Sequence, residues 1–270
     1  MNFSMKLREA SERNNSLLCI GLDTDLEYVP RKFLMESNPI VYFNRAIIDI
    51  TRNLVCAYKL NLAFYESLGI PGIDALRRTV KYIPKDIPVI GDAKRSDISN
   101  SARHYAKALF EVWNFDAATV NPYMGEDAIQ PFLEYRDKTV FVLCLTSNKG
   151  AEDFQLPDKL YLKVAHKIKE WNVYNNCGAV VGATHPDQVA EIRKVIEDAT
   201  MLVPGIGAQK GDLNQVVANG LNASREGLII NVSRGIIYAS NGEKFEEDIV
   251  KTTVEYRDAI NLARAQVRCE

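Results

Sequence analysis

The chain has 270 residues, of which 47% are hydrophobic and 25% are charged, and its formal net charge is -2. This composition is that of an ordinary globular protein, and the length suffices for one large α/β barrel around a single core. The balanced charge argues against nucleic acid as a main partner, because that partner requires a concentrated lysine and arginine surface.

The cysteines and the N-terminal segment indicate the compartment. The cysteine count of 5 is odd, no Cys-x-x-Cys pair occurs, and all but Cys269 lie within apolar runs. This pattern predicts small core residues in a reducing compartment, without a disulfide framework or a zinc site. Residues 1–15 contain no apolar stretch of signal-peptide length, and no run of about 18 apolar residues occurs. We therefore expect a cytoplasmic protein with no membrane partner.

Short apolar runs recur along the chain at intervals close to the size of a strand–helix unit. Most of them are continuous, without strict alternation, which is typical of parallel strands buried on both faces. Segments compatible with helices lie between them, such as 100–113 and 186–199, and the second begins with Pro186 in its first turn. The expected strands are 17–23, 54–61, 87–94, 116–121, 139–146, 177–183, 201–206 and 227–233.

This alternation favours a closed (β/α)8 barrel over an open doubly wound sheet. No linker or change of composition divides the sequence, so we predict a single (β/α)8 TIM barrel domain over residues 1–270. In such barrels the reactive groups follow the C-terminal ends of the strands. Polar residues collect at these ends, namely Asp23, Lys59, Asn61, Asp92, Lys94, Ser233 and Arg234.

Asp92 and Lys94 lie two apart at the end of the third expected strand, so both side chains can face the barrel mouth. A lysine beside carboxylates keeps its proton, because opposite charge favours the charged form. The pair could deliver a proton to a carbanion, while the aspartate disfavours an anionic group on the substrate. A structural ion pair at a strand end would fit the same motif, which by itself leaves both interpretations open.

The segment 204–212, PGIGAQKGD, has glycines that would let backbone N–H groups approach a phosphate. It is neither a Walker A loop nor a dinucleotide fingerprint, and an ordinary glycine-rich turn would explain it alone. Barrels of this kind often hold phosphate after strands seven and eight, where Arg234 could bind it bidentately. The three histidines have no metal-ligand spacing, so we predict no metal site.

The motif D-x-K-x-x-D-I is matched by Asp92, Lys94, Asp97 and Ile98. With GLDTD, YKLNLAFYE, TSNKGAEDFQ, PGIGAQKGD and NVSRGIIYAS in order around it, the chain resembles the orotidine 5'-phosphate decarboxylase family, in its longer prokaryotic-type subfamily. The resemblance implies removal of CO2 from orotidine 5'-phosphate to give UMP, the last step of de novo UMP synthesis, without cofactor or metal. Lys94 would protonate C6 of the pyrimidine, and Asp92 would lie against the leaving carboxylate.

The resemblance also implies a homodimer with shared sites, in which Asp97 reaches into the partner subunit's site. Asp23 and Lys59 would bind the ribose hydroxyls, and Ile98 and Ser101 would complete the pocket from the neighbouring chain. The pyrimidine edge and the phosphate would be bound by Ser147, Pro204, Gln209 and Arg234.

Two alternatives remain open. A metal-dependent sugar-phosphate decarboxylase or aldolase of the same barrel group shares the D-x-K-x-x-D motif. That group needs an acidic residue on the second strand to help bind magnesium, where Lys59 would repel the ion. A non-catalytic phosphate-binding barrel would have no need of a proton donor at Lys94.

Overall fold

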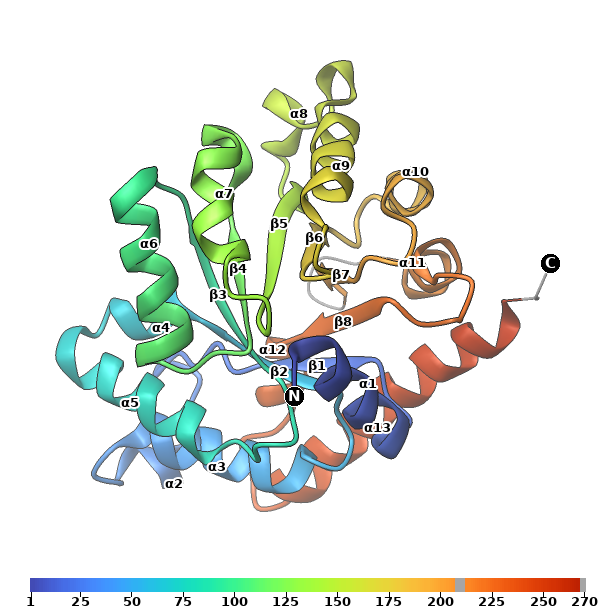
Figure 1. Cartoon of the computed structure of the whole chain (residues 1–270). Coiled ribbons are helices and arrows are strands. Elements are labelled where there is room, and N and C mark those ends of the chain that lie inside the picture. Colours follow the sequence, from blue (N-terminus) through green and yellow to red (C-terminus); the bar gives the residue numbers. More distant parts are fainter. Residues whose placement is uncertain (207–211, 268–270) are drawn as a thin grey trace.

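The computed structural model describes residues 1–206 and 212–267, so Gln209 and Cys269 lie outside the described residues. Parallel strands form a closed barrel in chain order, which confirms the predicted (β/α)8 fold (Figure 1). The strands are β1 (Leu18–Gly21), β2 (Ala57–Asn61), β3 (Val89–Arg95), β4 (Ala117–Val120), β5 (Thr139–Leu145), β6 (Cys177–Val181), β7 (Met201–Pro204) and β8 (Leu228–Val232).

Helices surround this barrel and connect successive strands (Figure 1). The expected helix at 100–113 is present, although its second half is a π-helical turn at Ala108–Val112. The α-helices are α1 (Phe3–Asn14), α2 (Arg31–Leu34), α3 (Pro39–Thr51), α4 (Leu62–Glu66), α5 (Gly69–Tyr82), α6 (Ser99–Lys107), α7 (Glu126–Leu133), α8 (Ala151–Phe154), α9 (Leu160–Trp171), α10 (Pro186–Ile196), α11 (Leu213–Gly220), α12 (Arg234–Ile237) and α13 (Phe245–Gln266).

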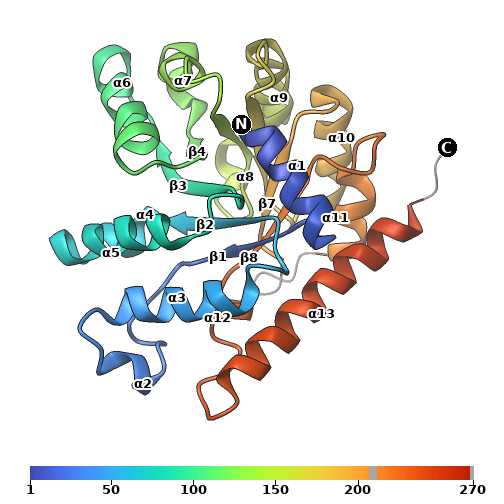
Figure 2. The same cartoon turned by 60° about the horizontal axis from the view of Figure 1, so that its bottom comes forward.

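The barrel interior is filled near its N-terminal end by one layer of apolar side chains. Phe3 of α1 packs against this layer, and its ring meets Phe141 edge-on with centroids 5.7 Å apart. Helix α1 therefore closes this end of the barrel (Figure 2). The layer consists of Cys19, Cys56, Ala57, Ile90, Ala117, Phe141, Val180, Leu202 and Ile229.

A second, larger cluster lies between the barrel and the helices. The long helix α13 packs against both α3 and α11, so it joins the last part of the helical ring to the first (Figure 2). The four cysteines in the described residues are buried and unbridged, as predicted. Within residues 1–206 and 212–267, no helix combines the length and the apolar composition that crossing a membrane requires.

Gly178 on β6 tests how tightly the strands and their surroundings pack. A Cβ added there would lie 2.4 Å from the Thr200 carbonyl oxygen. Because that oxygen belongs to the backbone, it cannot easily move away. We expect Gly178→Ala to lower the free energy of unfolding by about 1–3 kcal/mol, measured by urea denaturation. Gly242→Ala is the matched control, because nothing lies within 4 Å of its added Cβ. Equal stability of the two variants would contradict this packing.

Candidate active site

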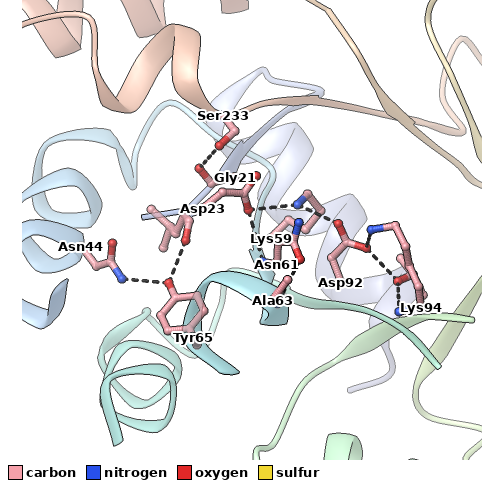
Figure 3. Close-up of polar contacts among 12 residues, drawn as sticks. Gly21, Asp23, Asn44, Lys59, Asn61, Ala63, Tyr65, Asp92, Lys94 and Ser233 are labelled. Carbon is pink, nitrogen blue, oxygen red and sulfur yellow. Dashed lines mark hydrogen bonds and ion pairs between the residues drawn. The ribbon is translucent and has the colours of Figure 1, made fainter. Parts of the chain in front are cut away.

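The C-terminal end of the barrel holds a buried ammonium between two carboxylates. Lys59 on β2 is 3% exposed. Its Nζ lies 3.2 Å from Asp23 Oδ1 and 3.0 Å from Asp92 Oδ2 (Figure 3). The strand order explains the contact: β2 pairs with both β1 and β3, so residues at the ends of three neighbouring strands meet at one edge.

Asp92 also binds a second lysine, Lys94. Its Oδ1 accepts hydrogen bonds from Lys94 Nζ at 2.6 Å and from Thr119 Oγ1 at 2.8 Å. Its Oδ2 accepts the bond from Lys59, so both carboxylate oxygens are bound (Figure 3). The two lysines differ in access: the Lys94 side chain is 47% exposed, whereas that of Lys59 is 4% exposed. Lys94 is therefore the more accessible of the two lysines to a molecule in the barrel mouth.

Burial and charge act in opposite directions on this cluster. Burial alone would raise the pKa of Asp92, but the charges of Lys59 and Lys94 outweigh it and hold the pKa well below its usual range. Burial alone would lower the pKa of Lys59, but Asp23 and Asp92 together raise it above the ordinary lysine value. Both groups therefore remain charged at neutral pH.

The backbone at Lys94 is not that of a regular strand. Lys94 has φ 49°, in the left-handed region, and the β3–β4 register shifts between Gly91 and Arg95. The Lys94 N–H donates to Thr119 Oγ1 at 3.0 Å, which supports this conformation from β4. The expected contact between Asp92 and Lys94 is present, but it depends on this irregularity as well as on strand alternation.

Asp23 is held by the ends of β1 and β2. Its Oδ1 also accepts a hydrogen bond from Asn61 N at 3.2 Å. The close approach of β8 requires glycine at position 21, because an added Cβ would lie 2.8 Å from Ser233 Cβ. Ser233 Oγ donates to the Gly21 carbonyl at 2.9 Å, which links the segment after β8 to the start of the Asp23 loop (Figure 3).

Three predicted site residues lie beyond β3 and outside this cluster. Asp97 accepts a hydrogen bond from Ile98 N at 2.8 Å, and no ion pair joins it to Lys94 in the described part of the same chain. Ile98 is 48% exposed, and Ser101 on α6 is exposed.

The remaining predicted residues follow strands on the other side of the mouth. Ser147 is half-buried after β5 and packs against Gly182, where an added Cβ would lie 2.6 Å from Ser147 N. Pro204 is half-buried at the end of β7, and Arg234 is exposed at the start of α12. Gln209 lies outside the described residues.

Sequence reasoning missed the supporting polar residues. Thr119 bonds both Asp92 and Lys94, and a polar residue near the end of an otherwise apolar fourth strand was a signal for it. Asn44 of α3 and Tyr65 of α4 form a fully buried hydrogen bond of 3.0 Å beneath the Asp23 loop. Residues so far apart in the chain show no shared pattern.

The acidic side chains at the mouth are neutralised by lysine. In the described ranges, no group of three or more His, Cys, Asp and Glu side chains is arranged to hold a metal ion. The carboxylates of Asp23 and Asp92 both bind Lys59. An ammonium therefore lies where a cation between them would have to bind.

Comparison with known proteins shows the family of this chain. The model of the "Orotidine 5'-phosphate decarboxylase / HUMPS family" matches residues 16–247. The chain belongs to this family, as the motifs predicted.

Individual proteins of the family are similar to this chain over most of its length. The orotidine 5'-phosphate decarboxylase of Herpetosiphon aurantiacus is 50% identical over 251 residues, which cover 91% of this chain and 92% of that protein. The solved structure of Leishmania donovani OMP decarboxylase has a TM-score of 0.86 at 40% identity, over 98% of this chain and 100% of that one. Leishmania donovani UMP synthase matches with a TM-score of 0.89 at 40% identity, but this chain spans only 57% of that longer chain.

Replacing Asp92 by asparagine tests the charge balance. The substitution leaves Lys59 and Lys94 without their shared anion, so we expect the free energy of unfolding at pH 7 to fall by about 3–5 kcal/mol. Because the pKa of Asp92 is depressed in the folded protein, its contribution is present above about pH 4 and is lost as the pH falls through the folded value. Urea denaturation should therefore show a smaller difference at pH 3 than at pH 7.

The matched control is Asp127→Asn, at an exposed aspartate in the first turn of α7. This variant should stay close to the parent at both pH values. An Asp92→Asn variant with parental stability at pH 7 would show that the two lysines do not need this carboxylate.

Proposed function

We propose that the protein decarboxylates orotidine 5'-phosphate to UMP, as the last step of de novo UMP synthesis in the cytoplasm, without cofactor or metal. The observation that carries the proposal is the fixed carboxylate of Asp92, bound by Lys59 and by the exposed Lys94. Membership of the family and the high identity to decarboxylases over nearly the whole chain support it. The buried free cysteines fit a reducing compartment.

The proposed reaction breaks one bond and forms one. The bond from C6 of the pyrimidine to its carboxylate breaks, CO2 leaves, and the electron pair stays on C6. The Lys94 ammonium donates a proton to that carbon, because Lys94 is the more accessible lysine of the cluster. Asp92 is already anionic and would lie against the substrate carboxylate, so loss of charge at that position favours the transition state over the bound substrate.

The rest of the mouth would bind the parts of the substrate that do not react. Asp23 and Lys59 would bind the ribose hydroxyls, and Ser147 would bind the pyrimidine edge. Phosphate would be bound after β7 and β8 by Gln209 and Arg234, with Pro204 at the end of β7. Binding energy from the distant phosphate can then be used to hold the reacting carbon against the charged cluster.

We also propose a homodimer in which Asp97, Ile98 and Ser101 complete the partner's site. Apolar side chains are exposed beside this segment, including Ile98 at 48% and Tyr105 at 39%. Tyr123, 84% exposed, precedes α7, which packs against α6. These exposed apolar side chains are available for a protein–protein contact. The same segment has Asp97, whose carboxylate forms no ion pair with Lys94 in the described part of its own chain.

The metal-dependent alternative is not favoured by any side-chain arrangement in the described residues. Its magnesium ion would have to bind beside Lys59, whose ammonium already contacts Asp23 and Asp92. A magnesium ion next to the Lys59 ammonium would be repelled strongly, because two positive charges lie close together in a buried site.

Two substitutions separate chemistry from binding. Lys94→Ala removes the proton donor, so we expect kcat for UMP formation to fall by about 10²–10⁴-fold or more. Arg234→Ala removes charged hydrogen bonds to phosphate worth about 1.5–3 kcal/mol, so KM should rise by about ten- to a hundredfold. Lys85→Ala is the control, at an exposed lysine before β3 and away from the mouth. A Lys94→Ala variant nearly as active as the parent in steady-state kinetics would contradict the role of Lys94 as the proton donor.

Mixing two inactive variants tests the shared site. In a homodimer of Lys94→Ala or of Asp97→Ala, both sites are damaged. A mixed dimer keeps one intact site, built from Lys94 of one subunit and Asp97 of the other. Random exchange makes half of the dimers mixed, so activity should recover to about a quarter of the parent. No recovery after subunit exchange, verified by differently tagged chains, would place Lys94 and Asp97 in the same subunit's site.

A further inference from the structure

The hydroxyl group of Tyr238 joins two loops that the proposed function uses separately. It accepts a hydrogen bond from Asp25 N at 2.7 Å and lies 3.3 Å from the Asp23 carbonyl oxygen, to which it can donate. Tyr238 directly follows the short helix α12, which begins at Arg234, and its backbone N–H donates to the Arg234 carbonyl at 3.3 Å. One side chain therefore connects the Arg234 segment to the backbone of Asp23.

The ring of Tyr238 is held independently of its hydroxyl. It stacks on Phe43 with ring centroids 5.9 Å apart and an interplanar angle of 14°, and it also packs against Tyr28. Burial raises the pKa of Tyr238 to about 12, so the hydroxyl keeps its proton at neutral pH and can donate as well as accept. Phenylalanine at this position would keep the packing and lose only the hydrogen bonds.

The opposite side of the Asp23 loop is fixed by a different set of residues. Tyr65 OH donates to the Leu22 carbonyl at 2.7 Å, and Thr24 Oγ1 donates to Asn44 Oδ1 at 2.5 Å. Asn44 in turn donates to Tyr65 OH (Figure 3). These buried bonds hold the loop against α3 and α4. They do not connect it to the segment after β8, which contacts the loop through Ser233 and Tyr238.

We propose that Tyr238 is a positioning residue that couples phosphate binding at Arg234 to the position of Asp23, and through Lys59 to Asp92. The inference rests on the proposed function, which assigns phosphate to Arg234. Each step along the path is a contact in the structure. The path runs from the Arg234 backbone carbonyl to Tyr238 at the end of α12, from Tyr238 to the Asp23 backbone, from Asp23 to Lys59, and from Lys59 to Asp92.

This coupling would let the binding energy of the phosphate assist the reaction. In the proposed reaction the phosphate would bind at Arg234, away from the reacting carbon, so its binding energy would assist the reaction only through parts of the protein that move or stiffen together. The Asp23 side chain forms an ion pair with the Lys59 ammonium, so its position depends on the Asp23 backbone. A shift of that backbone would change how Lys59 is shared between Asp23 and Asp92, and hence the field at the reacting carbon.

A double-mutant cycle on UMP binding tests the coupling. UMP has both the phosphate and the ribose, and its binding by calorimetry does not require turnover. We expect Tyr238→Phe to weaken UMP binding by about three- to tenfold, as for loss of one or two hydrogen bonds. In the Arg234→Ala background the same substitution should change binding by less than about twofold, because the two effects share one path.

Tyr82→Phe is the matched control. Its hydroxyl donates to Asp49 on the exposed surface, and its loss should leave UMP binding unchanged in both backgrounds. Equal effects of Tyr238→Phe with and without Arg234 would overturn the coupling and leave the hydroxyl as a local support of the loop. A Tyr238→Phe variant with a lower melting temperature but the UMP affinity of the parent would also overturn the coupling.

The outcome is separable from that of the proposed function. Parent protein that binds UMP but releases no CO2 from orotidine 5'-phosphate would contradict the decarboxylase assignment, while the cycle would still report on Tyr238. Active parent protein with additive effects in the cycle would contradict the coupling alone. Failure of the parent to bind UMP would overturn both.

Discussion

The site depends on one interaction, the sharing of the Asp92 carboxylate between two ammonium groups. A buried carboxylate without partners would take up a proton, because desolvation penalises its charge. Lys59 and Lys94 prevent this, and Lys59 also allows Asp23 to lie close to Asp92. The four groups together have no net charge. An anionic substrate carboxylate beside Asp92 would add a second negative charge there. When CO2 leaves, the electron pair stays on C6, so that charge would move away from Asp92 to a carbon that the Lys94 ammonium can protonate.

The fold serves this interaction by its strand order. Charged side chains at the ends of β1, β2 and β3 converge only because these strands are neighbours in a closed parallel barrel. The sequence was sufficient to predict this much: buried parallel strands read as continuous apolar runs, and each run ends in polar residues. The eight expected strands and the Lys59, Asp92 and Lys94 positions were found in this way. The family resemblance added the roles.

Other features depend on tertiary contacts that no local pattern encodes. The left-handed backbone of Lys94 is stabilised by Thr119 on the next strand, so its cause lies 25 residues away. Tyr238 and Asn44 read as ordinary helix-end and helix residues, and their hydrogen bonds to the Asp23 loop appear only once the chain is folded. A role of Asp97 in a second subunit concerns a surface, which single-chain periodicity does not describe.

We propose that fixed charges alone, without a metal ion or cofactor, drive the decarboxylation. The most direct measurement is the loss of ultraviolet absorbance of orotidine 5'-phosphate on addition of purified protein in the presence of EDTA. We expect rapid loss, with UMP as product and the same rate with and without EDTA. No loss in EDTA, with activity returning when magnesium is added in excess, would contradict it and favour the metal-dependent members of the same barrel group.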